Sequence, residues 1–321
     1  MSLTEYFNYV WSLRDPRTEG WGWSANYKFI FPLIGLYLYV VKIQGPKFMK
    51  SRPAYQLKPY ILTYNAFMVI TNAYFFWNYW KRSYGGGYYS WFCQGVSYSR
   101  DKNSMEILEL TWWYVLVRIA DFIDTIFFLL RKKYEHISML HVVHHTLVVL
   151  SGWLWLNFGT DGQILLGICI NAFIHIIMYT YYGLAALGPW TQKYLWWKRY
   201  LTKLQIIQFL ILNTHISIPL FYNCGYPRAL TLLAAGQGVV GLILFVNFYI
   251  KRYCVLRSPA GAGQTVKPSD TCRKPAGGIQ KETEPSPLRM LEKARKECCR
   301  QRSVRVPPFI CSQIERGSRT E

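Results

Sequence analysis

The stretch SMLHVVHHTLVVLSGWLWLN, from Ser138 to Asn157, is an apolar run interrupted by three histidines. It is long enough to cross the hydrocarbon core of a bilayer as an α-helix. His141, His144 and His145 stand at i, i+3 and i+4 and would share one face of that helix. Ionisable groups inside membrane helices are rare and usually mark a site or a pathway. The stretch therefore predicts a membrane helix with a chemical centre, rather than three packing residues.

Apolar runs of similar length recur along the chain, which has 321 residues, 51% of them hydrophobic and 17% aromatic. Only helices and closed barrels satisfy every backbone polar group in lipid, and the runs lack the alternating pattern of barrel strands. The predicted fold is therefore all-α, a polytopic bundle of seven transmembrane helices. The predicted spans are 27–43, 61–80, 110–130, 137–157, 163–184, 202–222 and 229–250.

Basic residues fall mainly in alternate loops, which predicts the orientation of the bundle. The loop 41–58 has five basic residues and no acidic one, and the loop after the third span is Arg-Lys-Lys at 131–133. By the positive-inside rule these loops face the cytosol. Residues 1–26 then form a luminal segment, and the carboxyl terminus is cytosolic. The loop 81–109 on the other side has four basic residues, so the asymmetry is incomplete.

Residues 251–321 differ in composition from the rest of the chain. They are rich in Lys, Arg, Pro, Ser and Gly and hold much of the formal net charge of +20. We expect a mostly disordered, basic cytosolic tail near an anionic leaflet. Basic residues without a folded module or aromatic platforms do not indicate nucleic-acid binding. The expected organisation is a luminal segment, a seven-helix catalytic domain at 27–250, and this tail.

Two of the eight cysteines stand apart from the others, because Cys93 and Cys224 alone fall in predicted luminal segments. The remaining six lie within a span or in the cytosolic tail, where the environment is reducing. The lumen is oxidising and permits disulfides. The sequence therefore predicts a bond between these two cysteines.

Polar residues of four predicted spans fall at one depth, near the cytosolic side. Asp124 lies seven residues before Arg131, which is about 10 Å along a helix, and the three histidines lie in the first turns of the next span. A buried Asp or Arg costs about 2.5–3.5 kcal/mol on insertion scales unless it is paired. We therefore expect a polar chamber inside the bundle. Its expected lining is Arg118, Asp121, Asp124, Thr125, His141, His144, His145, Asn171, His175, Tyr182, Thr202, Gln205 and Gln208.

Some of these residues have an equally good structural interpretation. Arg118 and Asp121 stand at i, i+3 and could form an ion pair whose role is only structural. His136 lies near the membrane surface and His215 deep in the sixth span, and both are expected to be packing residues.

The histidine cluster is compatible with two chemistries. Membrane di-iron desaturases and hydroxylases use HxxHH boxes, but they carry several boxes, and this chain has six histidines in all. A single metal supported by Asp121 and Asp124 remains an alternative. Otherwise an imidazole attacks a thioester, while a second histidine moves protons and a carboxylate orients the ring. A receptor or transporter would not need three histidines at one depth, and no inverted repeat is visible.

Five stretches together resemble the very-long-chain fatty acid elongases. HVVHH matches their signature box. GPKFMKSRPAYQLK, followed by Tyr64 and Asn65, is similar to their first cytosolic loop and second span, and RIADFIDTIFFLLRKK to their Lys-x-x-Glu-x-x-Asp-Thr stretch. NAFIHIIMYTYYGLAALGP and YLWWKRYLTKLQIIQF resemble two further blocks in the expected order. The resemblance covers about residues 27–250.

The resemblance implies a condensing enzyme of the endoplasmic reticulum membrane with an acyl tunnel in its helical bundle. Such an enzyme joins a long-chain acyl-CoA and malonyl-CoA into a 3-ketoacyl-CoA two carbons longer, releasing CoA and carbon dioxide without a cofactor. The middle histidine of the box, His144 here, would take the acyl group as an acyl-imidazole. Expected partners are membrane lipids, the reductases and dehydratase of the elongation cycle, and a second copy of the chain.

The other residues of the chamber receive roles from the same resemblance. His141, His145 and His175 would transfer protons or contact carboxylates, and Asp124 would orient a histidine. The expected substrate-binding residues are Arg118, Asp121, Asn171, Tyr179, Tyr182, Gln205, Gln208, Lys132 and Lys133.

Three features of this assignment are open or depart from the family pattern. Lys132 and Lys133 could be ordinary positive-inside residues instead of CoA ligands. Arg118 and Asp121 stand where the family usually has Lys and Glu, which keeps the charge but changes reach and geometry. The final GSRTE lacks the dilysine signal common in the family, so retention in the endoplasmic reticulum is expected to come from elsewhere.

Overall fold

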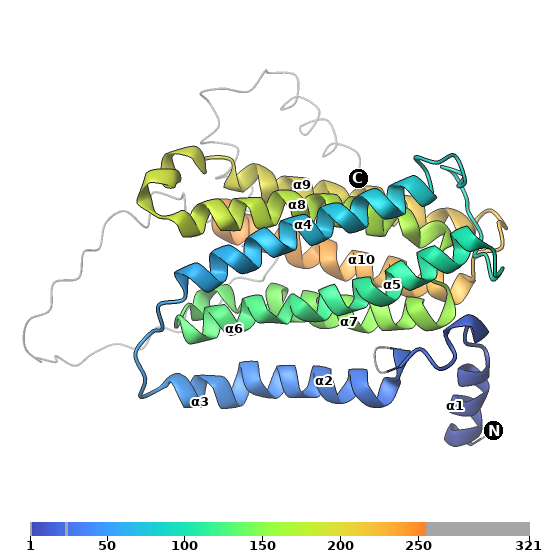
Figure 1. Cartoon of the computed structure of the whole chain (residues 1–321), viewed down its shortest axis with the longest axis horizontal. Helices are drawn as coiled ribbons and strands as arrows, with labels where there is room; N and C mark the ends of the chain where they lie inside the picture. Colours follow the sequence, from blue (N-terminus) through green and yellow to red (C-terminus); the bar gives the residue numbers. More distant parts are fainter. Residues whose placement is uncertain (1, 23–24, 255–321) are drawn as a thin grey trace, which may run out of the picture. The chain divides into compact units, whose positions relative to one another are not determined.

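A computed structural model of the chain describes residues 2–22 and 25–254, so most of the predicted tail lies outside the described residues. Helices and turns make up the described part, which contains no strand, and the all-α class is confirmed. Long helices lie side by side in the unit Met1–Ile250 (Figure 1). They are α2 (Tyr27–Tyr39), α4 (Lys58–Arg82), α5 (Lys102–Ala120), α6 (Phe122–Leu130), α7 (Met139–Phe158), α8 (Leu165–Leu187), α9 (Lys198–Ser217) and α10 (Arg228–Tyr249).

Shorter elements extend or connect these helices. A π-helical stretch, Val40–Gln44, and α3 (Gly45–Met49) continue α2, and α1 (Leu3–Ser12) precedes it. The remaining short helical elements are Pro16–Thr18, Tyr134–His136, Gly162–Ile164, Pro189–Tyr194, Ile218–Leu220 and Ile250–Cys254.

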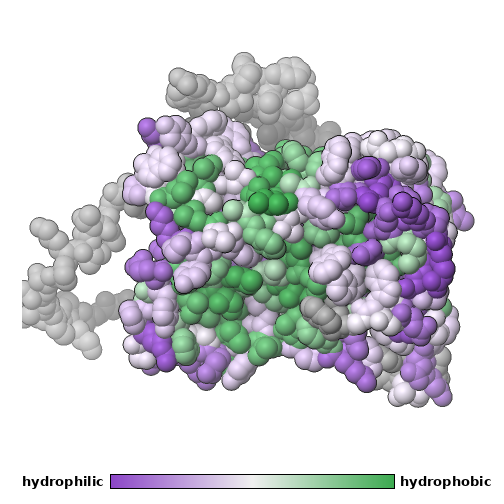
Figure 2. All heavy atoms as spheres, viewed as in Figure 1, coloured by the Kyte–Doolittle hydropathy of each residue, from purple (hydrophilic) through white to green (hydrophobic). Residues whose placement is uncertain are grey.

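Four helical segments are long and apolar enough to cross a membrane: Tyr27–Met49, Met139–Phe158, Gly162–Leu187 and Arg228–Tyr253. They coincide with four of the predicted spans, and the chain is a multi-pass membrane protein. The other three predicted spans are helical as well, in α4, α5 with α6, and α9. Figure 2 shows apolar residues gathered over the middle of the helices and polar residues toward both ends, as expected for a surface that contacts lipid.

The third predicted span is interrupted in its middle. Its two helices, α5 and α6, meet at Asp121, which belongs to neither of them. The Asp121 N–H donates to the Val117 carbonyl four residues back, whereas the Asp124 N–H donates to the Asp121 carbonyl only three residues back. The sequence predicts one continuous helix over 110–130, and the break at Asp121 lies in the most polar part of that span.

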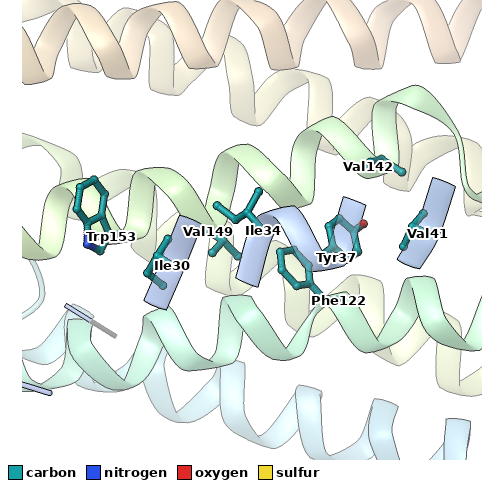
Figure 3. Close-up of a cluster of buried hydrophobic side chains, with 8 residues drawn as sticks. All are labelled: Ile30, Ile34, Tyr37, Val41, Phe122, Val142, Val149 and Trp153. Atoms are coloured by element: carbon teal, nitrogen blue, oxygen red, sulfur yellow. The ribbon is translucent and has the colours of Figure 1, made fainter. Parts of the chain in front are cut away.

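An apolar cluster joins α2 to α6 and α7. Ile30, Ile34 and Tyr37 of α2 pack against Phe122 of α6 and against α7 residues such as Val149 (Figure 3). The rings of Tyr37 and Phe122 stack with centroids 3.8 Å apart. Elsewhere α4 lies along α8, and α9 along α10.

The bundle has two distinct ends. At the disulfide end, the loop after α4 is joined to the loop before α10 by a bond between Cys93 and Cys224, the pair predicted from the sequence. The basic end holds the loop Arg131–Lys133. There Gly188 ends α8 with a φ of +132°, which favours glycine, and Lys58 donates to the carbonyl of Leu187.

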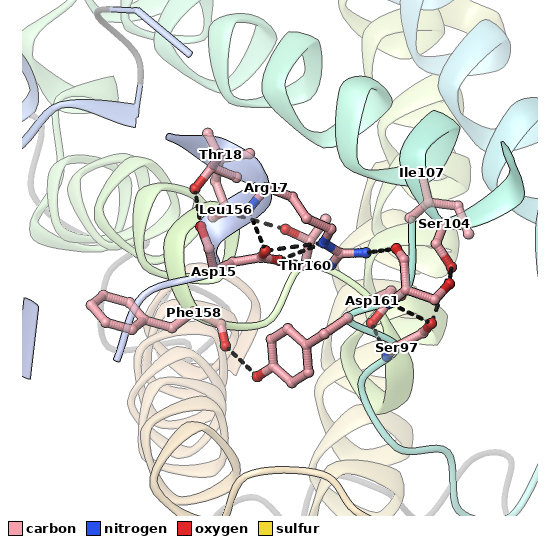
Figure 4. A network of polar contacts seen from close by, with 12 residues as sticks. Asp15, Arg17, Thr18, Ser97, Ser104, Ile107, Leu156, Phe158, Thr160 and Asp161 are labelled. Carbon is pink, nitrogen blue, oxygen red and sulfur yellow. Dashed lines mark hydrogen bonds and ion pairs between the residues drawn. The ribbon is translucent and has the colours of Figure 1, made fainter. Parts of the chain in front are cut away.

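A buried ion pair fastens the amino-terminal segment to the disulfide end. Arg17 donates to Asp15 through Nη2 at 2.6 Å and to the Ser99 carbonyl through Nη1 at 2.8 Å. The Asp15 N–H donates to the Asn157 carbonyl at the end of α7. We call the Asp15–Arg17 pair, with its contacts to Ser99 and Asn157, the N-terminal latch. Figure 4 shows the latch beside Asp161. Burial raises the pKa of the Asp161 carboxyl to about 6.

Candidate active site

A pocket runs lengthwise between five helices, α5, α7, α8, α9 and α10. The residues contributed by α7 show how it is built. His144 and Trp155 both line it, together with residues 147, 148, 151 and 152 between them. This spacing is one face of a helix, and 11 residues span about 16 Å. The pocket therefore extends from the histidine box toward the disulfide end.

Most of the pocket wall is apolar. Polar side chains near His144 are Arg118, Asn171 and Gln208. At the disulfide end Gln163 Nε2 lies 3.2 Å from His215 Nε2. The lining also includes Thr111, Ser151, Asn213 and Gln237. A long, mostly apolar pocket suits an elongated apolar ligand.

The three histidines of the box occupy different positions. Ser138 caps the helix by accepting from the N–H of His141, which places the box in the first turns of α7. In the described chain, His144 alone of the three lines the pocket. His141 Nε2 lies 2.8 Å from the Thr125 hydroxyl, and its ring centroid is 4.3 Å from that of His145. Two imidazoles thus stand behind the one that a ligand can reach.

Arg118 connects the pocket to the fourth candidate histidine. Its Nη1 lies 2.8 Å from His175 Nδ1 and 3.1 Å from Asp121 Oδ2, and its Nη2 donates to Asn72 Oδ1. Arg118 and Asp121 are 2% and 1% exposed. The predicted ion pair is therefore present, yet Arg118 also lines the pocket, and its Nε has no hydrogen-bond partner in the described chain. His175 is held beside the pocket by this guanidinium and does not line it.

Asp124 contacts tyrosines. The Tyr179 hydroxyl lies 2.8 Å from Asp124 Oδ2 and 2.8 Å from Asp121 Oδ1. The Tyr64 hydroxyl is 3.4 Å from Asp124 Oδ2. Asp124 was expected to orient a histidine, whereas its carboxyl is hydrogen-bonded in the structure to the hydroxyl groups of Tyr64 and Tyr179.

The remaining predicted site residues separate into two groups. Asn171 and Gln208 line the pocket, and Tyr114 donates to Asn171 Oδ1. Outside it, Gln205 contacts the sulfur of Met178 at 3.7 Å, and Tyr182 is 37% exposed. Lys132 and Lys133 lie at the basic end, where Lys133 is 3.9 Å from Glu135.

Several polar residues that reach the site were not predicted. Asn72 is fully buried and holds Arg118 in place. Tyr114 places its ring under the same guanidinium, 4.6 Å away. Tyr37 is hydrogen-bonded to Thr125. Each lies in a stretch of mostly apolar or aromatic residues, so no local pattern distinguished it from a packing residue.

The geometry gives no support to the metal-dependent alternative. No group of three or more His, Cys, Asp or Glu side chains is arranged to hold a metal ion among the residues described. One ring nitrogen of each of two histidines is already engaged, His141 Nε2 by the Thr125 hydroxyl and His175 Nδ1 by the Arg118 guanidinium.

Comparison with known proteins gives the same answer. The profile described as ELO, the GNS1/SUR4 family, matches residues 23–260. The chain belongs to this family. Very long chain fatty acid elongase 4 of Homo sapiens is 39% identical over 261 residues, 81% of this chain and 82% of that protein. Very long chain fatty acid elongase 7 of Drosophila melanogaster is 38% identical over 246 residues, 74% of this chain and 73% of that protein.

The family match covers the helices from α2 to α10. Very long chain fatty acid elongase 5 of Rattus norvegicus is also similar, 34% identical over 256 residues, 78% of this chain and 83% of that protein. The matched residues 23–260 contain every helix that lines the pocket.

Proposed function

We propose that this ELO protein is the condensing enzyme of fatty acid elongation, an acyltransferase of the very-long-chain 3-oxoacyl-CoA synthase type. It joins a long-chain acyl-CoA and malonyl-CoA into a 3-ketoacyl-CoA two carbons longer. One observation carries the assignment beyond family membership. His144 lines one end of a long, mostly apolar pocket, so an acyl chain lying in the pocket would present its thioester to this imidazole.

The reaction then divides into two steps that use the same histidine. In the first, an imidazole nitrogen of His144 attacks the thioester carbon, and CoA leaves as the thiolate, which takes up a proton. In the second, malonyl-CoA loses carbon dioxide, and the resulting carbanion attacks the acyl-imidazole carbon. The bond to His144 breaks, and the 3-ketoacyl-CoA forms. The sum is acyl-CoA, malonyl-CoA and a proton giving 3-ketoacyl-CoA, CoA and carbon dioxide.

Neighbouring residues supply charge and orientation for these steps. Arg118 lines the pocket together with His144, and its positive charge suits the negative charge that develops on a carbonyl oxygen. Asn171 and Gln208 offer amide donors at the same end of the pocket. His141, His145 and His175 take the proton-transfer roles, and no resident cofactor is used.

The proposed setting is the endoplasmic reticulum membrane, with seven spans enclosing the polar chamber and acyl tunnel. Four apolar spans support a membrane bundle, and the Cys93–Cys224 bond supports a luminal disulfide end. The basic end would then face the cytosol, where Lys132 and Lys133 can meet CoA phosphates. Reductases and a dehydratase would process the product, and a homo-oligomer is part of the proposal.

Release of labelled carbon dioxide from carboxyl-labelled malonyl-CoA tests the function directly. Purified protein with a chelator should release it only when a long acyl-CoA is present. His144→Ala should abolish the release, while the surface variant His136→Ala serves as a matched control because its side chain is 49% exposed. Release that does not depend on acyl-CoA, or that persists in His144→Ala, would contradict the proposal.

A further inference from the structure

The Tyr179 hydroxyl is shared by two carboxyl groups. It lies 2.8 Å from Asp121 Oδ1 and 2.8 Å from Asp124 Oδ2. All three residues are buried, with exposed fractions of 0% for Tyr179, 1% for Asp121 and 8% for Asp124. Both distances are short enough for a hydrogen bond, but a hydroxyl has a single hydrogen to donate.

Counting hydrogens shows that one proton is missing from this group. If both aspartates were ionised, one of the two contacts would join a carboxylate oxygen to a hydroxyl oxygen with no hydrogen between them. Tyr64 does not supply it, because its hydroxyl is farther away, 3.4 Å from Asp124 Oδ2, and also lies 3.2 Å from the Ala120 carbonyl. One carboxyl must therefore be protonated.

The surrounding charges decide which aspartate bears the proton. Asp121 has a cation beside it, because Arg118 Nη1 is 3.1 Å from its Oδ2. The hydrogen bonds of Asp124 in the described structure come from tyrosines. Arg118 and Asp121 already neutralise each other, and a second carboxylate would leave a net charge buried in the membrane, which is costly.

The groups that face Asp124 come from each helix packed around it. Tyr64 reaches it from α4 and Tyr179 from α8, while Arg118 approaches from α5 and Asp121 from the break between α5 and α6. From α2 and α7, Tyr37 and His141 reach Thr125, the next residue in the chain.

We propose that Asp124 holds a proton and acts as a positioning residue for the histidine site. Its carboxyl O–H donates to Tyr179, and the Tyr179 O–H donates to Asp121. Asp121 in turn accepts from Arg118, whose guanidinium holds His175 and faces the pocket. The four side chains form one directional chain from α6 to the histidines. The positioning role rests on the proposed acyl transfer, whereas the protonation of Asp124 does not.

Infrared spectroscopy tests the protonation without any activity assay. The purified protein in mildly alkaline buffer should show the carbonyl stretch of a protonated carboxyl, which shifts on exchange into heavy water. The band should vanish in Asp124→Asn and persist in Asp161→Asn. Asp124→Glu, which keeps a carboxyl, should move the band if the asparagine variant does not fold. A band absent from the wild type, retained in Asp124→Asn, or lost in Asp161→Asn would overturn the proposal.

Kinetics test the positioning role separately. Asp121→Asn leaves Arg118 without a counter-charge and should lower kcat by about 100-fold. The Asn side chain of Asp124→Asn can still donate to Tyr179, whereas the Leu side chain of Asp124→Leu cannot. The kcat of Asp124→Asn should therefore be at least about tenfold higher than that of Asp124→Leu. In the wild type, raising the pH removes the Asp124 proton and activity falls, and Asp124→Asn should lack this alkaline fall. Equal losses in the two Asp124 variants, or an unchanged alkaline fall in Asp124→Asn, would overturn the role.

If no variant or wild-type sample condenses substrates while the infrared band behaves as described, the proposed function fails and the protonated Asp124 stands. If condensation is normal and the band is absent, this inference fails and the proposed function stands.

Discussion

Two buried arginine–aspartate pairs serve this protein in different ways. In the N-terminal latch, each guanidinium nitrogen of Arg17 donates within the chain, to Asp15 or to the Ser99 carbonyl. In the site, Arg118 pairs with Asp121 but keeps an Nε that has no partner in the described chain. Buried donors are nearly always satisfied, so the fully bonded Arg17 indicates a structural role, and the unpaired Nε of the pocket-lining Arg118 indicates a role beyond packing.

The surroundings of the two pairs differ in the same sense. Arg17 lies between the amino-terminal segment and the loops of the disulfide end, where its bonds connect segments distant in sequence. Arg118 lies in α5 beside a break in the helix, within contact of His175 and of the pocket. Replacing each arginine should therefore affect different properties: stability for Arg17 and catalysis for Arg118.

The largest effect is expected for Arg118→Met. Loss of the guanidinium removes the pocket donor and the support of His175, and kcat/KM for condensation should fall by about 100-fold or more. Arg118→Lys together with Asp121→Glu recreates the charged pair usual in the family and should recover much of the activity. Initial rates of carbon dioxide release measure both. Near-normal rates in Arg118→Met would show that Arg118 has no catalytic role.

Arg17→Met should instead destabilise the folded protein. Removing one partner of a buried ion pair typically costs about 3–5 kcal/mol, and Tm in detergent should fall while kcat per folded molecule is unchanged. Arg14→Met is the matched control, because Arg14 pairs with Glu19, which is 71% exposed. Such a pair contributes about 1 kcal/mol or less. Equal shifts in Tm for the two variants would show that the latch is not a stabilising element.

The Cys93–Cys224 disulfide, like the Arg17–Asp15 pair, should contribute to stability and not to catalysis. Cys93→Ser removes a bond that closes 131 residues of sequence, and such bonds typically stabilise by about 2–4 kcal/mol. A lower Tm with unchanged acyl-CoA dependence of carbon dioxide release is expected. Cys169→Ser, a buried cysteine outside the bond, is the control. A Cys93→Ser variant as stable as the wild type would contradict this expectation.

The smallest effect concerns the pH dependence of stability near the latch. Burial raises the pKa of the Asp161 carboxyl from 3.8 to about 6, so the folded state keeps a proton that the unfolded state has lost. Stability from this group is therefore present at low pH and is lost as pH rises between about 4 and about 6. The Tm of Asp161→Asn minus that of the wild type should increase by a few degrees over this window. A difference that does not vary with pH would show that Asp161 does not titrate there.

Much of the architecture could be predicted because membrane helices are determined by local composition. The four apolar spans found in the structure coincide with predicted ones, and only two cysteines were predicted to be luminal, which left one choice of partner. The break at Asp121 was missed, because a helix interrupted for one residue keeps the same hydropathy as a continuous one. The latch was missed as well, although Asp15 before Pro16 is a helix-start signal that could have been recognised.

The site was predictable as a set of residues but not as a network. The shared depth of polar groups brought His144, Arg118, Asn171 and Gln208 into one predicted set, and all four line one pocket in the structure. Which histidine faces the cavity depends on the rotation of α7 against four other helices, and periodicity along one helix does not determine that rotation. Hydrogen-bond partners depend on contacts between distant segments, so the tyrosine partners of Asp124 could not be predicted.

The most direct test of the account is whether His144 itself receives the acyl group. Protein incubated with a long acyl-CoA and no malonyl-CoA should gain the mass of one acyl chain, release one equivalent of CoA, and yield a modified peptide containing His144. Adding malonyl-CoA should discharge the acyl group as 3-ketoacyl-CoA. Acylation that maps to another residue, or turnover by a His144→Ala variant, would contradict the account.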